Sequence, residues 1–454
     1  MAKDVGRSVL FVLGVWGVGG VERVTVVLGN ALAARGWRVT VVAFGIEERT
    51  LLEDFAPGVM VKALAFPVGS TGNVKALRAL MAAREVRFVV NQWALPYGVT
   101  RLLRKAGRGL GVRFVAVLHN IPTNNGRIAS ARGVKRWLWR VLSGLNLRLT
   151  YRASDAFVVL SERFEPLFRR MAWLARSPKL LTLPNPLTLP PAPSVPKEAA
   201  VLYVGRLEET QKRVSRVLEV WRRLATNRED ASCVGGFALT GRSAPCRANL
   251  PRQHDAVRTP AQVCEGYHKE LKEHKGSEGW RLDIVGDGPD RAALERAAEG
   301  LPNVTFHGFQ DPAPFYARAR LLLLTSDFEG FSLVLVEAMA AGCVPVVLGS
   351  YPAAYDLVRG TNGVVVAPPF SAEGFARVVG DLMAHPAALD GMAEVARETA
   401  QTYSVEAAAT RWETLFAELS GNAPSGTRDV GSEQKPAYIP TRPTFEANPA
   451  FPAD

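Results

Sequence analysis

Cysteine is scarce in this chain, which has four cysteines in 454 residues. So few cysteines cannot build a disulfide framework, and they fit a reducing compartment such as the cytoplasm. Long apolar runs are also missing, since no stretch approaches the roughly 18 residues that a membrane-spanning helix needs. The apolar run at residues 8–21 follows Lys3 and Arg7, but it is rich in glycine and leads into a helical pattern. We therefore do not expect a secretory signal peptide.

Acidic residues are absent from one long segment. Residues 86–154 contain no Asp or Glu, whereas 13 of them are Lys or Arg. Residues 1–182 carry 28 basic and 10 acidic residues, a net charge of +18, and the remainder carries 27 and 33, a net charge of −6. This asymmetry indicates either an anionic partner for the first half or a solvated basic surface. No nucleic-acid recognition motif is present, so we do not expect nucleic acid as the partner.

Short apolar runs alternate with helical patterns in two blocks, which predicts an α/β fold with two doubly wound, Rossmann-like domains. In the first block the expected strands are 9–13, 39–43, 88–90, 114–118 and 156–160, and in the second they are 200–204, 281–285, 304–306, 321–324 and 344–348. A Pro-rich stretch at 183–197 separates the blocks. Two such sheets in tandem predict a central cleft that the carboxyl ends of their strands face.

The predicted domains are residues 1–190 and 197–403, with a C-terminal helix at 404–420 that we expect to join the first domain. Residues 226–278 are polar, lack periodicity and read as an inserted segment. They contain three of the four cysteines and three of the six histidines, but no close-paired Cys spacing. We therefore expect a flexible loop with free thiols and no metal site. Residues 421–454 are predicted to be a disordered tail.

The segment around Glu329 has the pattern of an anion-binding site. It follows the strand at 321–324, and a helix is expected to begin near Ser332. The unpaired N–H groups at such a helix start attract an anion such as a nucleotide diphosphate, and Gly330 allows a close backbone approach. Glu337 in the second helical turn is suited to accept hydrogen bonds from ribose hydroxyls, and Glu329 from sugar hydroxyls. The alternative is an ordinary strand–loop–helix with a surface glutamate.

A second pair of residues follows the first strand of the same domain. Arg206 comes directly after Gly205, and Lys212 follows shortly after. A guanidinium and an ammonium beside a diphosphate neutralise the charge that grows on a leaving group. The alternative is a salt-bridged surface pair.

The order and spacing of five motifs resemble the family-4 retaining glycosyltransferases of GT-B fold. The similarity covers roughly residues 8–225 and 279–418. The motifs are Gly19-Gly20-Val21-Glu22-Arg23, Gly205-Arg206 with Lys212, Gly286-Asp287-Gly288-Pro289, Phe306-His307-Gly308, and the pair Glu329 and Glu337 at Glu-x7-Glu spacing.

The resemblance implies roles for individual residues. The implied catalytic residues lie beside the transferred sugar or clamp the diphosphate, and they are His119, Arg206, Lys212 and Glu329. For His119 the alternative is a histidine of the core. The implied donor-binding residues include Glu337 at the ribose and backbone amides at the phosphates, and they are Gly205, Gly286, Gly330, Phe331, Ser332, Leu333 and Glu337. The implied acceptor-side residues are Gly19, Gly20 and Glu22.

The resemblance also implies a reaction. The family transfers sugars with retention of the anomeric configuration, by a front-side route in which the leaving phosphate helps to deprotonate the acceptor. Catalysis then rests on positioning and charge stabilisation. The sequence has no Asp-x-Asp triplet, so we expect no essential divalent metal, and no cofactor beyond the nucleotide-sugar donor substrate.

Basic and aromatic residues mix at residues 132–152, where a helix is expected that carries Trp137 and Trp139. This mixture suits contact with an anionic membrane surface, while the alternative is a cleft-lining helix whose tryptophans pack inside the domain. A glycan or a lipid-linked acceptor, such as a polyprenyl-diphosphate glycan or a lipopolysaccharide core, would explain both the charge and the aromatic residues. Residues 91–97 also resemble segments of bacterial surface-polysaccharide transferases. We therefore expect a cytoplasmic protein at the inner face of the cytoplasmic membrane.

Two other functions fit a fold of this kind. A sugar-nucleotide epimerase needs acid and base carboxylates in the cleft, and Glu22 is the only acid of the first domain near a predicted cleft loop. A nucleotide-sugar-binding protein without activity is the other alternative. The intact set of Glu329, Glu337, Arg206 and Lys212 argues against it.

Overall fold

The computed structural model describes residues 6–122, 128, 131–190, 195–233 and 279–421. Helix α7 (Val214–Cys233) extends into the segment that the sequence analysis assigns to an insertion from residue 226, so the start of that segment was predicted wrongly. The sequence of residues 226–233 is mostly polar and lacks apolar residues at helical spacing, so it gives no signal that the helix continues. The remainder of the predicted insertion and the predicted tail after residue 421 lie outside the described residues.

The N-terminal domain is built on a seven-stranded parallel sheet with the order β3-β2-β1-β4-β5-β6-β7. Its strands are β1 (Ser8–Leu13), β2 (Arg38–Ala43), β3 (Met60–Ala63), β4 (Phe88–Asn91), β5 (Arg113–Leu118), β6 (Ala156–Val159) and β7 (Leu180–Thr182). The accompanying helices are α1 (Gly20–Ala34), the short helix η1 (Thr50–Leu52), α2 (Thr71–Ala83), α3 (Tyr97–Ala106), α5 (Gly133–Ala153) and α6 (Phe164–Met171).

The C-terminal domain has a six-stranded parallel sheet with the order β10-β9-β8-β11-β12-β13. Its strands are β8 (Glu198–Val204), β9 (Arg281–Val285), β10 (Val304–Gly308), β11 (Ala319–Leu324), β12 (Val344–Leu348) and β13 (Val364–Val366). Besides α7, the helices are α9 (Arg291–Ala297), α10 (Ala313–Arg318), α11 (Leu333–Ala340), α12 (Ala354–Leu357), α13 (Ala372–Ala384) and α14 (Pro386–Gln401), and the chain then continues into α15 (Val405–Leu419). The prediction of two doubly wound domains is confirmed.

The central strands form because their apolar runs are covered on both faces. Every residue of β1 and of β12 is buried, as expected for a parallel strand between two helical layers. The edge strands differ, since the residues of β3, β7 and β13 are mostly half-buried or exposed.

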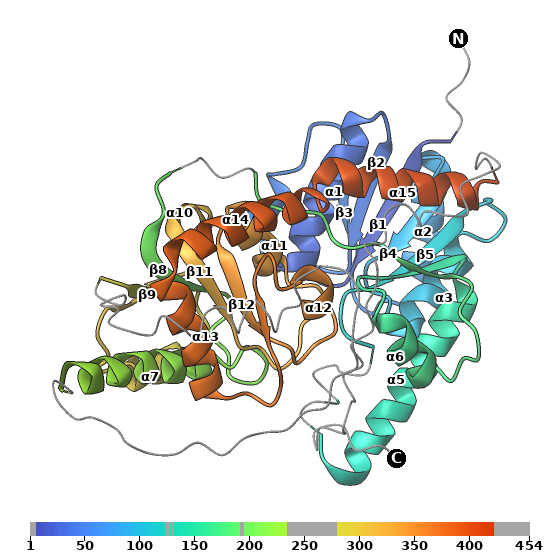
Figure 1. Ribbon diagram of the computed structural model, residues 1–454. Coiled ribbons are helices and arrows are strands. Elements are labelled where there is room, and N and C mark those ends of the chain that lie inside the picture. Colours follow the sequence, from blue (N-terminus) through green and yellow to red (C-terminus); the bar gives the residue numbers. More distant parts are fainter. Residues whose placement is uncertain (1–5, 123–127, 129–130, 191–194, 234–278, 422–454) are drawn as a thin grey trace, which may run out of the picture.

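The chain crosses between the two domains twice, at two points that lie side by side. The first crossing follows β7, and the second joins α14 to α15 (Figure 1). The backbone N–H of Leu187 on the first crossing donates to the carbonyl oxygen of Tyr403 on the second, at 2.7 Å. Helix α15 then packs against α1, and its Phe416 stacks on Phe88 of β4 with ring centroids 4.4 Å apart. The last described helix therefore belongs to the N-terminal domain.

Candidate active site

The loop after β11 holds a buried carboxylate. Glu329 is 6% exposed, and its Oε1 lies 2.6 Å from the ammonium nitrogen of Lys212. The hydroxyl of Ser326 donates to the same oxygen at 2.8 Å, and Gln211 reaches Oε2 at 3.4 Å. Lys212 and Glu329, which the sequence analysis takes from separate motifs, thus form one ion pair. The pair holds a charged carboxylate and an ammonium at the carboxyl end of the sheet.

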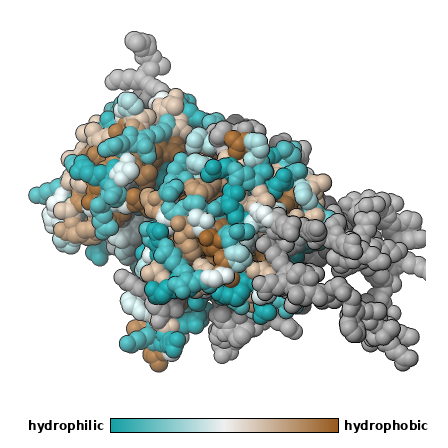
Figure 2. Space-filling model, turned by 90° about the vertical axis from the view of Figure 1, so that its left-hand side faces the viewer, coloured by the Kyte–Doolittle hydropathy of each residue, from teal (hydrophilic) through white to brown (hydrophobic). Residues whose placement is uncertain are grey.

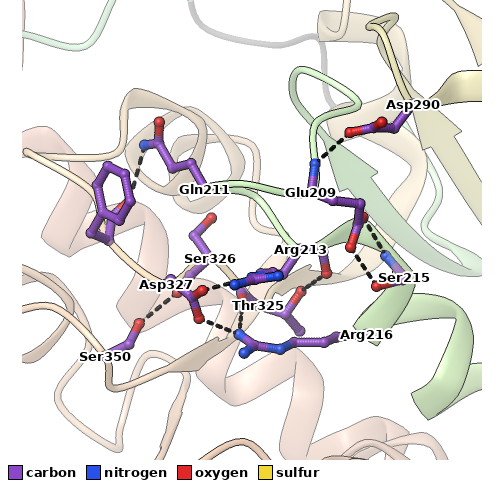
Figure 3. Close-up of polar contacts among 11 residues, drawn as sticks. Glu209, Gln211, Arg213, Ser215, Arg216, Asp290, Thr325, Ser326, Asp327 and Ser350 are labelled. Carbon is purple, nitrogen blue, oxygen red and sulfur yellow. Dashed lines mark hydrogen bonds and ion pairs between the residues drawn. The ribbon is translucent and has the colours of Figure 1, made fainter. Parts of the chain in front are cut away.

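A second carboxylate, Asp327, fixes the path of this loop (Figure 3). Its Oδ2 accepts a hydrogen bond from Nε of Arg213, and its Oδ1 accepts one from Nη1 of Arg216, both at 2.6 Å. The backbone N–H of Asp327 also donates to the carbonyl oxygen of Gln211 at 2.8 Å. The loop that carries Glu329 is therefore tied to the segment that carries Lys212. No motif in the sequence predicts a role for these arginines.

Helix α11 begins without a side-chain cap. Ser332 precedes it with φ 60° and ψ 82°, a left-handed conformation that is uncommon outside glycine and costs free energy. No side chain of the N-cap residue accepts from the first turn, so backbone N–H groups at this end are open to an anion. The predicted role of the Ser332 and Leu333 amides is compatible with this geometry.

Glu337 is buried at the contact between the two domains. The hydroxyl of Tyr316 donates to its Oε2 at 3.1 Å, and the hydroxyl of Thr188, on the first crossing, donates to its Oε1. Nη1 of Arg23, at the start of α1, lies 3.7 Å from the same Oε1. Burial and the carboxylate of Glu337 raise the pKa of Tyr316, which keeps its hydroxyl protonated as a donor. The sequence motif predicts Glu337 in the site but not these three partners.

His119 follows β5, and its backbone contacts the C-terminal domain at Gly330. Its Nε2 lies 2.6 Å from Oε1 of Gln92, while its Nδ1 is buried without a hydrogen-bond partner. Burial lowers the pKa of this histidine to about 4. A Cβ atom added to Gly330 would lie 1.8 Å from the backbone oxygen of His119. The glycine therefore allows the Glu329 loop to touch the backbone at His119.

The acceptor-side glycines lie opposite the start of α11. Helix α1 begins at Gly20, and its N-cap residue Gly19 offers no side chain. A Cβ atom on Gly20 would lie 3.1 Å from Cδ1 of Leu333. The carboxylate of Glu22 folds back over Gly19. This loop and the donor-side helix therefore face each other at close range.

The donor-side glycines Gly205 and Gly286 let two loops pack together. Gly286 has φ 141°, and a Cβ atom on it would lie 1.9 Å from the backbone oxygen of Gly205. The N–H of Gly205 donates to the carbonyl oxygen of Val285 at 3.0 Å. These glycines thus hold the loop that carries Arg206 in place.

Among the described residues, the side chains of two predicted site residues make no hydrogen bond or ion pair with the other predicted site residues. Arg206 has a side chain that is 68% exposed, and its one recorded ionic neighbour among the described residues is Glu208 at 3.9 Å. The ring of Phe331 is buried and packs edge-on against Tyr403, with centroids 5.5 Å apart. Any contact of Phe331 with a ligand therefore has to use its backbone.

Within the described ranges, no group of three or more His, Cys, Asp or Glu side chains is arranged to hold a metal ion. Among the described helices, none is both long and apolar enough to cross a membrane.

Comparison with protein families places both domains among glycosyltransferases. Residues 18–186 match the model of Glycosyltransferase Family 4, and residues 252–385 match that of Glycosyl transferases group 1. The two matches fall on the N-terminal and C-terminal domains, respectively.

Three curated proteins are similar in sequence. An uncharacterized glycosyltransferase of Haemophilus influenzae is 21% identical, over 91% of this chain and 100% of its own length. The lipopolysaccharide core biosynthesis glycosyltransferase LpsE of Rhizobium meliloti is 31% identical over 37% of this chain and 51% of its own. An exopolysaccharide phosphotransferase of Streptomyces coelicolor is 34% identical over 37% of this chain, but the match spans 18% of that protein.

Solved structures share the whole architecture. HepE of Anabaena, solved in complex with UDP and glucose, has a TM-score of 0.61 at 17% identity, over 91% of this chain and 100% of its own. The lipopolysaccharide outer core galactosyltransferase WaaB has a TM-score of 0.59 at 16% identity, over 90% of this chain and 99% of its own. At these identities the likeness establishes the arrangement of the two domains.

Proposed function

The chain is a family-4-like glycosyltransferase of the GT-B fold, and from this premise we propose that it moves a sugar from a nucleotide-diphosphate sugar to a glycan or lipid-linked acceptor in cell-surface polysaccharide synthesis. The observation that carries the proposal is the ion pair of half-buried Lys212 with buried Glu329 next to the uncapped start of α11. The similarity to LpsE, which is named for lipopolysaccharide core biosynthesis, supports the acceptor class. The similarity to HepE, which was solved with UDP and glucose, supports the donor class.

The charges of the site suit departure of a nucleotide diphosphate. The open N–H groups at the start of α11 and the ammonium of Lys212 are positive groups that stabilise the charge developing on the leaving phosphate. Arg206 is exposed on a loop that glycines fix, and its side chain is free to turn toward the same phosphate. Glu329 accepts hydrogen bonds from the sugar once Lys212 turns to the diphosphate.

The finer part of the proposal is that transfer proceeds with retention and without a divalent metal. The site contains one carboxylate beside the sugar position, Glu329, and its partner is Lys212 rather than a second acid. Such an arrangement favours a route in which the leaving phosphate takes the acceptor proton, because Lys212 engages Glu329 and burial lowers the pKa of His119 to about 4, which makes its imidazole a weak base.

The decisive experiment incubates the protein with a panel of nucleotide sugars and measures release of nucleotide diphosphate, with and without lipid-linked acceptors. Glu329→Ala and Lys212→Ala should each lower the rate on the order of 10²-fold or more. Glu394→Ala, which removes an exposed ion pair with Arg397 on α14, should not change it. Wild-type rates in both site variants would refute the assignment.

The same assay separates the remaining alternatives. Conversion of the sugar without release of diphosphate would identify an epimerase, and binding without turnover would identify an inactive protein. Proton NMR of the product reports whether the anomeric configuration is retained. Unchanged turnover after chelation with EDTA would agree with a metal-independent reaction, and loss of turnover that Mg²⁺ or Mn²⁺ restores would contradict it.

We further propose that α5 brings the enzyme to an anionic membrane. Its exposed apolar side chains recur at helical spacing and form one stripe: Val134, Trp137, Leu138, Leu142 and Leu145. Trp137 is 64% exposed, whereas Trp139 packs against the core. Trp137 is thus placed as membrane contact would require, whereas Trp139 packs inside the domain, which was the alternative.

Basic residues surround this stripe, as an anionic surface requires. Helix α5 carries five Lys or Arg residues and no acid, and Trp173 lies 50% exposed beside Gly144 in the same surface. The start of α5 projects below the rest of the N-terminal domain (Figure 1), and the lowest part of the molecule in the space-filling view shows hydrophobic atoms beside hydrophilic ones (Figure 2). Aromatic and apolar groups flanked by cations bind at a lipid interface.

Liposome flotation tests this second proposal. The wild-type protein should float with vesicles that contain phosphatidylglycerol and not with pure phosphatidylcholine, and 0.5 M salt (roughly three times physiological) should reduce the bound fraction. Trp137→Ser should reduce it as well, whereas Phe309→Ser, which changes an aromatic residue that is 72% exposed on the other domain, should not. Absence of lipid-dependent flotation at low salt would overturn the proposal.

A further inference from the structure

Gln92 lies at the carboxyl edge of the N-terminal sheet and is held there by its backbone. It follows β4 directly, and its N–H donates to the carbonyl oxygen of Val12 at 2.9 Å. Strand β4 pairs with β5, which ends just before His119. Gln92 is 6% exposed. The sheet therefore sets the place of both side chains before any substrate arrives.

The hydrogen bond between these side chains determines where the imidazole carries its proton. Oε1 of Gln92 can only accept, so Nε2 of His119, at 2.6 Å, must donate. A neutral imidazole has one N–H group, and Nδ1 is then left with a lone pair. That atom is buried and has no hydrogen-bond partner. A buried acceptor without a donor is costly, unless a ligand supplies the donor.

The surroundings of the ring keep it neutral. Burial lowers the pKa of His119 to about 4, and burial is the only cause of the shift. Among the described residues no carboxylate pairs with the ring, and its side-chain partner is the uncharged amide of Gln92. Since Gly330, the neighbour of Glu329, touches the backbone of His119, the histidine lies beside the loop that carries Glu329.

We propose that Gln92 is a positioning residue that fixes His119 in the Nε2–H form, so that Nδ1 accepts a hydrogen bond from a hydroxyl of the transferred sugar. This inference rests on the proposed function for its substrate. It extends that function by assigning the direction of the hydrogen bond between the sugar and His119. The sugar hydroxyl must donate, and Nδ1 must accept. A donor substrate that lacks the hydroxyl there leaves Nδ1 without a partner and is selected against.

The protonated nitrogen is observable without any activity. In protein labelled with ¹⁵N-histidine, the long-range ¹⁵N–¹H spectrum should show His119 with a proton on Nε2 at pH 7, and its signal is assigned by its loss in His119→Gln. Gln92→Leu should change or mix the two forms. Gln310→Leu, which removes an exposed glutamine beside His307, should not. A proton on Nδ1 in the wild-type protein would overturn the proposal even if glycosyltransfer is established.

Kinetics distinguish positioning from a structural role. Gln92→Leu should lower kcat/KM on the order of tenfold or more, as for loss of one oriented hydrogen bond. Gln92→Glu should restore the rate above neutral pH, because a carboxylate also accepts from Nε2–H. That carboxylate should raise the pKa of His119, so the variant should lose activity on the acid side, where the wild-type protein does not. Equal rates in all three proteins, or failure of the glutamate to restore the rate, would contradict the role of Gln92.

Discussion

At the scale of single residues, Gly330 joins the two halves of the site by its lack of a side chain. A Cβ atom there would lie 1.8 Å from a backbone oxygen of the other domain, and a backbone atom cannot turn aside as a flexible side chain can. This contact between the domains therefore requires glycine at position 330.

We expect Gly330→Ala to lower kcat/KM for the donor at least tenfold, because the Glu329 loop must withdraw from His119. The melting temperature should change little, since the added methyl group disturbs the contact between the domains and not the core of either. Gly391→Ala on α14, where no atom lies within 4 Å of the added Cβ, is the matched control. Full activity of Gly330→Ala would show that this contact is dispensable.

His119 should make stability depend on pH. Its pKa is lowered from 6.5 to about 4 in the folded protein, so between these values the unfolded chain binds a proton that the folded chain does not. The free energy of unfolding therefore falls as the pH falls through this window, on the order of 1 kcal/mol per pH unit. Urea unfolding at pH 7 and pH 4.5 should show a smaller loss for His119→Gln than for the wild-type protein. Equal losses would place the pKa near its ordinary value.

The sequence motifs predict the charged residues of the candidate site but not the partners that the structure gives them. Glu329, Lys212 and Glu337 stand in motifs with characteristic spacing, so their positions could be predicted. Thr188, which contacts Glu337, lies in the Pro-rich crossing and has no motif around it. Gln92 had a weak signal, because polar residues at the end of a buried strand point to a cleft. Which partner each side chain meets depends on how the domains close, and spacing along the chain does not encode that.

At the scale of helices and strands, α15 is held by an aromatic cluster. Phe416 is 1% exposed and packs between Phe88, Trp37 and Trp412. The indole nitrogen of Trp37 also donates to Glu413 at 2.8 Å, which fixes the rotation of the helix. Trp37 and Glu413 are 376 residues apart in the sequence, so these contacts join the two ends of the described chain.

Phe416→Ala should lower the free energy of unfolding by about 3–5 kcal/mol, because it removes a fully buried ring and leaves a cavity. Phe309→Ala, at a ring that is 72% exposed, should change it by less than about 0.5 kcal/mol. Urea unfolding followed by fluorescence measures both. A loss for Phe416→Ala no larger than that of the control would mean that α15 contributes little to the N-terminal domain.

Prediction of these elements succeeded where burial is complete. The central strands were predicted because they are continuous apolar runs, whereas β3, β7 and β13 lie at sheet edges and carry half-buried residues that produce no such run. On α5, Trp137 and Trp139 are two residues apart and therefore point to nearly opposite sides of the helix. The sequence suggests an amphipathic helix, but which of its sides meets the core depends on the neighbouring elements.

At the scale of the whole molecule, polar contacts join the two domains beside an apolar cluster that both domains share. Asp356 on α12 accepts hydrogen bonds from Ser161 and, at 2.7 Å, from Nε of Arg163, and both donors belong to the N-terminal domain. With the contacts of Glu337 to Arg23 and Thr188, they connect the C-terminal domain to the rest of the chain at two places.

We expect Asp356→Ala to shift the molecule toward an open form, because it leaves Ser161 and Arg163 without this partner. Small-angle X-ray scattering should show a larger radius of gyration, and the KM for the donor should rise several-fold. Asp390→Ala removes an ion pair with Arg320 inside one domain and should alter neither quantity. An unchanged scattering curve for Asp356→Ala would mean that other contacts suffice to keep the domains closed.

The hydrogen bond between Leu187 and Tyr403 has a consequence for how the domains move. Both covalent connections between the domains pass through the point where Leu187 and Tyr403 meet. The C-terminal domain is therefore an insertion into the domain that the rest of the chain forms. Relative motion is then a rotation about a short axis at this place, and displacement grows with distance from the axis. The two domains therefore separate most on the side away from the crossings, and we expect a bulky acceptor to enter there.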